Sequence, residues 1–266
     1  MKNKFIVILG VILMSNSLAQ ANNNIQIVEE FYQRFFNQAD VTVVDELIAE
    51  NYIQHNPTLP NGRDAIKAFV AEGPFSANIK RIGSEDNLVY VQVEYPAINT
   101  AAFDIFRIEN GIIQEHWDVQ AAINNPLISP ANGNTVFDGT NSNQKRSIQI
   151  EAKNKEIIQI FFDEFFNKGN ANILDEIMTE DYIQHNYDIP NGRESIKPFV
   201  AKGAFPAEIK HMVAFKDLVF VHTFYPILNS VAVDLFRLEN AKIAEHWDVV
   251  QQITPASETV SANPMF

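Results

Sequence analysis

The sequence contains one long internal repeat, in which residue 51 of the first copy corresponds to residue 181 of the second. The stretch NYIQHNPTLPNGRDAIK at 51–67 matches DYIQHNYDIPNGRESIK at 181–197, with eleven of seventeen positions identical. FDIFRIENGIIQEHWDVQ at 103–120 matches VDLFRLENAKIAEHWDVV at 233–250, with eleven of eighteen positions identical. Each copy is about 115 residues long, which suits a domain and is too long for one unit of a solenoid. The repeat therefore predicts two tandem domains with one fold.

The ends of the two copies also correspond and set the domain bounds. GNTVF at 133–137 resembles ANPMF at 262–266, so the first domain is expected to include a tail that ends at residue 137. The segment DGTNSNQKRS that follows is polar and rich in Gly, Asn and Ser, as expected of a flexible connection. We predict a first domain at 22–137, a linker at 138–147 and a second domain at 148–266.

Residues 1–21 have the composition of a secretory signal peptide. Lys2 and Lys4 precede an apolar run at 5–14, and the segment ends in Ala19-Gln20-Ala21. A run of ten apolar residues is too short to cross about 30 Å of hydrocarbon. We expect export to the periplasm or the medium, with no membrane association after cleavage.

Charge and cysteine content narrow the possible partners. The 266 residues include no cysteine, so an exported form has no disulfide and is stabilised by packing alone. The net charge is −13, and removal of Lys2 and Lys4 with the signal peptide gives −13 − 2 = −15. An acidic surface repels phosphate backbones, so nucleic acid is not an expected partner.

Within each copy, helical periodicity comes first and strand periodicity follows. Aromatic and aliphatic residues at 27–36 and 157–166 recur at helical spacing, a second short helix is expected at 43–48, and a third follows Asn61-Gly62. Pro198 predicts a late start or a kink in the third helix of the second copy. Strands are predicted at 88–95, 102–109 and 112–120. This order indicates an α+β fold with helices on one face of an antiparallel sheet.

The turn at Asn110-Gly111 decides which side chains share a face of this sheet. A two-residue turn would place Asp104 on the same face as Trp117. A three-residue turn with a bulge would pair Asp104 with His116. We favour the three-residue turn, because it gathers the polar residues on one face; that face carries Asp104, Phe106, His116 and Asp118, and the other carries Ile105, Arg107, Glu115 and Trp117.

Ala241 stands in the second copy where the first has Gly111. Alanine adopts a left-handed backbone conformation poorly. The second turn is therefore expected either to differ from the first or to store strain.

The pattern YIQHNP–NG…DIFR-ENG-I-EHWDV-Q after a Phe-rich helix resembles the SnoaL-like polyketide cyclase family, which has the nuclear-transport-factor-2-like fold. The resemblance covers both copies. It implies two cone-shaped domains, each a curved antiparallel sheet covered by about three helices with a pocket in its mouth, packed as an intramolecular pseudo-dimer that is monomeric in solution. It also implies a pocket histidine on the central strand, which the second copy has as His222 and the first replaces with Gln92.

The resemblance favours acid–base chemistry on a small carbonyl compound, as in aldol condensation, cyclisation or isomerisation. A carboxylate desolvated in a pocket can act as a base near neutral pH. We predict Asp118 and Asp248 as general base or acid, with His55 and His185 donating to the carbonyl oxygen. The residues predicted to orient these groups or to line the pockets are Asp104, His116, Phe106 and Phe69 in the first copy and Asp234, His246, Phe236, Phe199 and His222 in the second.

Simpler roles stay open for each of these residues. His116 and Asp118 could form a structural hydrogen-bond network, His55 could anchor a turn beside Asn56, and the aromatic stripe at 27–36 is expected to be core. Trp117 and Trp247 are expected in packing or at an interface.

Two other functions also remain open. The protein could be a non-catalytic periplasmic module that binds a small apolar ligand. His116-x-Asp118 with His55 imitates a two-histidine, one-carboxylate iron site, although this motif is common by chance. Phosphate-binding loops and the motifs GxGxxG, HExxH and GxSxG are missing from the sequence, so NTP and nicotinamide cofactors and lipase-type chemistry are not expected. The family resemblance does not imply a metal, and we therefore expect no cofactor and no metal.

Overall fold

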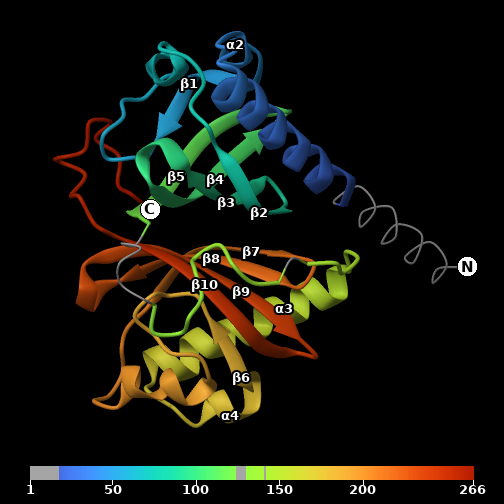
Figure 1. The fold of residues 1–266 in the computed structure, drawn as a ribbon, viewed down its shortest axis with the longest axis vertical. Coiled ribbons are helices and arrows are strands. Elements are labelled where there is room, and N and C mark those ends of the chain that lie inside the picture. The colour runs from blue at the N-terminus through green and yellow to red at the C-terminus, as the bar shows by residue number, and fades with distance from the viewer. Residues whose placement is uncertain (1–17, 124–129, 141) are drawn as a thin grey trace, which may run out of the picture.

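The computed structural model describes residues 18–123, 130–140 and 142–266 (Figure 1). Most of the predicted signal peptide lies outside the described residues. A helix covers residues 18–31. Among the residues described, no helix combines the length and apolar character needed to cross a membrane.

Two units of the same fold follow one another along the chain. We call residues 18–123 unit one and residues 148–253 unit two. In unit one the helix at 18–31 continues into the π-helix η1 (Tyr32–Asn37). The remaining elements of unit one are α2 (Thr42–Leu47), β1 (Ile48–Gln54), η2 (Arg63–Val70), β2 (Asn78–Glu85), β3 (Leu88–Tyr95), η3 (Pro96–Ile98), β4 (Thr100–Glu109) and β5 (Ile112–Ala122).

Unit two repeats this order. Its elements are α3 (Ile148–Ile160), the π-helix η4 (Phe161–Asn167), α4 (Ile173–Ile177), β6 (Met178–Gln184), η5 (Arg193–Ser195), η6 (Lys197–Val200), β7 (Glu208–Phe215), β8 (Leu218–Tyr225), η7 (Pro226–Leu228), β9 (Ser230–Glu239) and β10 (Lys242–Gln252). The third helix of unit one is the continuous 3₁₀ helix η2, whereas in unit two it is split into η5 and η6, with Pro198 near the start of η6. The predicted effect of this proline is confirmed, because its ring and missing N–H are tolerated only in a first turn.

Each unit has one five-stranded sheet, and the predicted α+β fold in two tandem units is confirmed. The strand order is β1-β5-β4-β3-β2 in unit one and β6-β10-β9-β8-β7 in unit two. The sheets are mixed rather than fully antiparallel, because β1 pairs with β5, and β6 with β10, in parallel. The sequence pattern also missed β2, whose residues NIKRIGSE do not form an apolar run.

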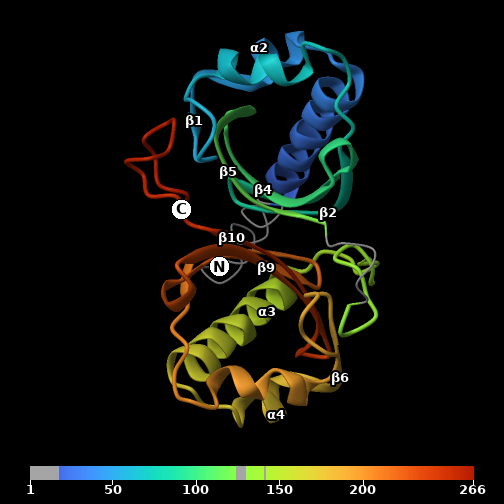
Figure 2. The ribbon, with the colours of Figure 1, turned by 60° about the vertical axis from the view of Figure 1, so that its left-hand side comes forward.

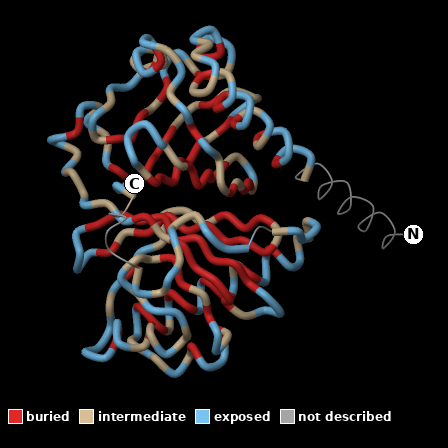
Figure 3. The backbone as a smooth tube through the Cα atoms, in the orientation of Figure 1, coloured by how far each residue is buried: buried red, intermediate tan, exposed pale blue. Residues whose placement is uncertain are grey.

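Three apolar clusters stabilise the structure, one inside each unit and one between the two units. In unit one the aromatic stripe of the first helix and η1 packs against the sheet, and its members Phe31 and Phe35 stack with ring centroids 5.0 Å apart. Unit two has the same cluster around Phe161 and Phe165. The third cluster lies between the sheets and joins residues of β3, β4 and β5 to those of β8, β9 and β10, including Trp117 and Trp247. The two sheets therefore pack against each other, and the buried residues in Figure 3 follow these strands.

The two units exchange their C-terminal tails. Residues 130–138 follow unit one but bind the end of β6 in unit two, where Asn134 Nδ2 donates to the carbonyl of Gln184 at 3.0 Å. Residues 259–266 follow unit two but bind the end of β1 in unit one, where Asn263 Nδ2 donates to the carbonyl of Gln54 at 2.9 Å. In Figures 1 and 2 the red C-terminal segment accordingly lies beside the blue and green unit. The tail of each unit thus binds the end of the strand, β6 or β1, that contributes residues to the other unit's site.

Candidate functional site

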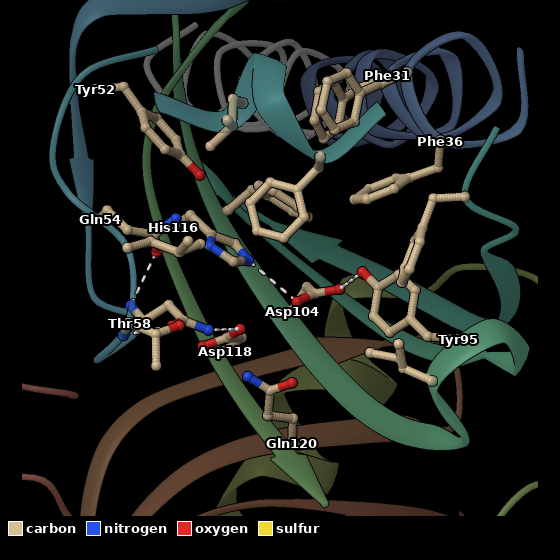
Figure 4. Close-up of a pocket in the computed structure, with 18 residues that line it drawn as sticks. Phe31, Phe36, Tyr52, Gln54, Thr58, Tyr95, Asp104, His116, Asp118 and Gln120 are labelled. Carbon is tan, nitrogen blue, oxygen red and sulfur yellow. Dashed lines mark hydrogen bonds and ion pairs between the residues drawn. The ribbon is translucent and has the colours of Figure 1, made fainter. Parts of the chain in front are cut away.

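Each unit encloses a cavity between its helices and the concave face of its sheet. The cavity of unit one has a volume of about 240 Å³ (Figure 4). Its lining is mostly aromatic and aliphatic around a polar centre; the residues are Phe31, Phe35, Phe36, Tyr52, Gln54, Asn56, Thr58, Leu59, Ile66, Phe69, Phe75, Tyr95, Ile98, Asp104, Phe106, His116, Asp118 and Gln120. The corresponding cavity of unit two has about 340 Å³.

The hairpin of β4 and β5 supplies the polar centre. Asn110 and Gly111 both have positive φ, 52° and 80°, so the turn has two residues and the predicted three-residue turn is wrong. A bulge between Arg107 and Ile108 nevertheless shifts the register, so that Asp104 pairs with Asp118 and not with His116. The bulge produces the face that we expected from a longer turn.

This face carries the predicted acid and imidazole groups. Asp104, Phe106, His116 and Asp118 all line the cavity, and Trp117 points instead into the cluster between the sheets. In unit two Asp234, Phe236, His246 and Asp248 line the equivalent cavity. Phe69 and Phe199 also line the cavities but are 45% and 43% exposed, which places them at the rims.

The repeated stretch YIQHN directs alternate side chains to opposite sides. Gln54 and Asn56 point into the cavity, because residues two apart in an extended strand share a face. The Gln54 Oε1 atom accepts hydrogen bonds from the backbone N–H groups of His55 and Asn56, both at 2.9 Å. These two donors fix the orientation of the Gln54 amide.

This orientation defines the protonation of His116. Its Nδ1 atom lies 3.0 Å from Gln54 Oε1 and its Nε2 atom lies 3.1 Å from Asp104 Oδ1. Both partners are acceptors, so both ring nitrogens donate and the ring is an imidazolium. Burial alone would lower the pKa of His116, but the hydrogen bond and charge of Asp104, with the charge of Asp118, raise it.

Asp104 accepts hydrogen bonds from three side chains. Besides His116, its Oδ2 atom accepts from the hydroxyls of Tyr32 and, at 2.7 Å, of Tyr95. Unit two has Phe162 in place of Tyr32, and there Asp234 accepts from Thr223 Oγ1 at 2.7 Å and from Tyr225 at 2.9 Å. The two units therefore satisfy the same buried carboxylate with hydroxyls from different strands or helices.

Asp118 is the group most suited to proton transfer. Its Oδ2 atom accepts from Asn56 Nδ2 at 2.6 Å, whereas its buried Oδ1 atom has no hydrogen-bond partner among the residues that the structure describes. Burial raises the pKa of Asp118 to about 6, helped by the charge of Asp104 and opposed by His116 and the Asn56 hydrogen bond. A carboxylate with a pKa near neutrality and one free oxygen can accept a proton from a bound molecule.

The equivalent aspartate of unit two is held differently. Both oxygens of Asp248 accept from Asn186 Nδ2, at 3.0 and 2.8 Å. Burial also raises the pKa of Asp248, and the charge of Asp188 adds to this increase. Asp188 lines this cavity at the position of Thr58 in unit one, so the second site contains one more carboxylate than the first.

His55 and His185 lie on the opposite side of the sheet from the cavities, which corrects the prediction that they contact the substrate. His55 stacks on Trp117 with ring centroids 4.7 Å apart, and its Nε2 atom lies 2.8 Å from Glu115 Oε1. Its Nδ1 atom lies 2.6 Å from the carbonyl oxygen of Pro264, in the exchanged tail. His185 has the equivalent contacts with Trp247, Glu245 and Thr135. Strand alternation turns these histidines away whenever Gln54 and Gln184 point inward.

His222 is also outside the cavities, and the prediction that it lines the pocket is corrected. It lies on β8, opposite His211 of β7, and shares a face of that strand with Phe220, which packs in the cluster between the sheets. Gln92, its counterpart in unit one, donates from Nε2 to the carbonyl of Val136 at 2.9 Å and belongs to the same interface.

Sequence reasoning missed several residues that line or organise the site. Gln54, Asn56 and Tyr52, with Gln184, Asn186 and Tyr182 in unit two, line the cavities. The signal was present in the repeated YIQHN stretch, where Tyr52, Gln54 and Asn56 alternate.

A metal ion is the other group these residues could hold. One ligand atom from each of Asp104, His116 and Asp118 lies within 4.8 Å of the others, and Asp234, His246 and Asp248 form the same group in unit two. His55 does not belong to the set, contrary to the metal hypothesis. Both nitrogens of His116 already face acceptors, so metal binding would require the Gln54 or Asp104 hydrogen bond to break. The donor set therefore fits proton transfer better than a metal.

The fold and site of each unit define a cone-shaped α+β domain of the nuclear-transport-factor-2-like class with an acid–imidazole cavity. Residues 28–116 match the family model described as SnoaL-like domain. Unit one is therefore a SnoaL-like domain, and unit two repeats its fold and its acid–imidazole residues.

Solved structures similar to this chain each align with the length of about one unit. A candidate SnoaL-like polyketide cyclase from Jannaschia sp. CCS1 is 21% identical, covering 41% of this chain and 91% of that chain with a TM-score of 0.33. A nuclear-transport-factor-2-like protein of unknown function from Mesorhizobium loti is 18% identical, covering 40% and 97% with a TM-score of 0.35. TsrD from Streptomyces laurentii is 15% identical, covering 40% and 92% with a TM-score of 0.33. A search of curated protein sequences found no match.

Proposed function

We propose that unit one is an enzyme site that moves a proton at a carbon next to a carbonyl group, as in an aldol-type cyclisation or an isomerisation. The observation that carries this proposal is the buried carboxylate of Asp118, which lines an aromatic cavity and has a pKa of about 6. Its Oδ1 atom has no hydrogen-bond partner in the described part of the chain. Such a group combines the basicity and the desolvation that removal of a proton from carbon requires.

In this mechanism Asp118 Oδ1 takes the proton from the carbon, and the electron pair of the C–H bond moves onto the carbonyl oxygen. Tyr52 is the proposed donor to the resulting oxyanion. Burial, with the charges of Asp104 and Asp118, raises the pKa of Tyr52 well above its usual range, so its hydroxyl stays protonated. Figure 4 shows this hydroxyl on the same side of the sheet as the carboxylates. The enolate then either receives a proton at another carbon or attacks a second carbonyl of the same molecule.

The cavity volumes indicate small substrates. An apolar cavity of about 150 Å³ holds one benzene ring. Cavities of about 240 and 340 Å³ therefore suit compounds of one or two rings, with Phe69 or Phe199 at the rim. Apolar rings would pack against Phe31, Phe36 and Phe106 while the carbonyl end meets the polar centre.

The test compares Asp118→Asn, Asp248→Asn and the double variant on a panel of one- and two-ring ketones in D₂O. NMR follows exchange of the protons next to the carbonyl, and calorimetry follows binding. We expect Asp118→Asn to slow exchange by about 10²–10⁴-fold while binding stays within a few-fold. Exchange that is equally fast in the double variant and the unchanged protein would refute the proposal.

A non-catalytic binding role is the second candidate, and one observation favours it for unit two. Both oxygens of Asp248 are occupied by Asn186, so this cavity offers a less available base. In that case Asp248→Asn leaves exchange nearly unchanged, and native mass spectrometry of the purified protein detects a small molecule that a Phe199→Ala variant no longer retains.

We also propose that the protein is exported, cleaved after Ala21, and monomeric as an intramolecular pseudo-dimer. The charged start and apolar run support export, and the packing of the two sheets covers the faces through which single domains would pair. N-terminal sequencing of protein from the periplasm or medium tests the first point, since a mature chain that begins elsewhere than Asn22 contradicts it. Analytical ultracentrifugation tests the second, which a dimer of full chains would overturn.

A further inference from the structure

Two histidines face each other at the edge of the sheet where the units meet. His211 on the edge strand β7 pairs directly with His222 on β8, and their ring centroids lie 5.8 Å apart. This pair is distinct from the acid–imidazole cavities, because neither residue lines them.

Unit one has a different pair at the same positions, and its members are joined by a hydrogen bond. Arg81 Nη1 donates to Gln92 Oε1 at 2.6 Å, and Arg81 Nη2 donates to the carbonyl of Asp138 at 2.7 Å. Gln92 Nε2 donates to the carbonyl of Val136 at 2.9 Å. In unit one these side chains thus fasten the tail that follows it.

The histidine pair has no such partners. His222 is completely buried, and neither of its ring nitrogens has a hydrogen-bond partner in the described part of the chain. The buried Nδ1 atom of His211 likewise has none among those residues. Unpartnered buried polar groups are rare in folded proteins, and a bound ion is one of the explanations for such a group.

We propose that His211 and His222 together bind a transition-metal ion of the Zn²⁺ or Cu²⁺ class. A metal bound at about 2.0–2.1 Å to an imidazole nitrogen lies about 3.2 Å from the ring centroid, so two rings that share it have centroids up to about 6.4 Å apart. The observed 5.8 Å falls within this limit. Imidazole is a preferred ligand of both ions.

The surroundings favour the neutral form of both imidazoles, which is the form that binds a metal ion. Burial lowers the pKa of His222 to about 3, with the charges of His211, His55 and Lys210 adding to the effect. Burial and the charge of His55 also lower the pKa of His211, while the negative charge of Glu115 opposes them. Glu115, which already pairs with His55 and Arg107, offsets part of the positive charge around His211. His211 is less buried than His222 and provides a route from solvent.

The experiment titrates the metal-free full chain with ZnCl₂ and CuSO₄ by calorimetry, with electron paramagnetic resonance on the copper form. We expect one ion per chain at this site and nitrogen couplings from two imidazoles. The matched variant His211→Arg/His222→Gln installs the pair that unit one already has, and it should fold normally by circular dichroism while its affinity falls at least tenfold. His222→Gln alone should weaken binding in the same direction.

A second variant separates this site from the cavities. Asp118→Asn/Asp248→Asn removes a carboxylate from each acid–imidazole group, and binding at the histidine pair should be unchanged in it. The proposal is overturned if the unchanged protein binds neither ion, or if the double histidine variant binds with the same affinity and stoichiometry. Loss of binding in the aspartate variant alone would assign the ion to the cavities and also overturn it.

Discussion

Replacing Asp118 with asparagine should make the folded protein more stable while it removes the proposed base. The folded state raises the pKa of this carboxyl from 3.8 to about 6. Between these two values the folded state holds a proton that the unfolded state has released. Stability therefore falls as pH rises from about 4 to 6 and is constant above that range.

The size of the effect follows from the same values. At about 1.4 kcal/mol for each pKa unit, ionised Asp118 costs the folded state about 3 kcal/mol at pH 7. At pH 4.5 the folded carboxyl is protonated, and the cost falls to about 1 kcal/mol. The asparagine amide of the variant retains an oxygen that can accept the 2.6 Å hydrogen bond from Asn56, so little is lost in exchange. We expect a gain of about 1–3 kcal/mol at pH 7, and a smaller gain at pH 4.5.

Chemical denaturation of the variant and the unchanged protein at both pH values measures this difference. The matched control is Asp181→Asn, which removes one charge from an exposed position and should change the free energy of unfolding by less than about 0.5 kcal/mol. The reasoning is refuted if Asp118→Asn lowers stability at pH 7, or if its gain is the same at pH 4.5. Either result would mean that Asp118 is a structural hydrogen-bond acceptor rather than a desolvated base.

Three further pairs of substitutions test the differences between the units and the exchange of their tails. Ala241 has a φ of 59° at the turn position where Gly111 has 80°. In chemical denaturation, Ala241→Gly should therefore stabilise the protein by about 0.5–1 kcal/mol, and Gly111→Ala should destabilise it by about 1–2 kcal/mol. Effects of equal size and the same sign would contradict this. Tyr32→Phe removes one hydrogen-bond donor from Asp104 and should lower the free energy of unfolding by about 1–2 kcal/mol. Adding Val93→Thr, which places a hydroxyl where unit two has Thr223, should restore part of this stability. No recovery would argue against the idea that the two hydroxyls replace each other. Asn263→Ala should loosen Gln54 and raise hydrogen exchange at the end of β1, whereas Asn134→Ala should do so at the end of β6; the reverse pattern would exclude the exchanged tails.

Much of the architecture was readable from local patterns. The internal repeat predicted two units, and the change from helical to alternating periodicity predicted helices followed by strands. Alternation also predicted which residues of 104–118 share a face, even though the turn that we expected was wrong. The face was right because a bulge and a longer turn both shift the register by a single position.

The sequence by itself determined the duplicated fold and the acid–imidazole face of each hairpin, because strand and helix periods depend on near neighbours in the chain. Only the tertiary structure decided which side of YIQHN faces the cavity. Gln54, His55 and Asn56 are all polar, so hydrophobic patterning cannot orient them. Pairing of β1 with β5, and binding of the other unit's tail to His55, turn Gln54 and Asn56 inward, and these contacts join residues up to 209 positions apart.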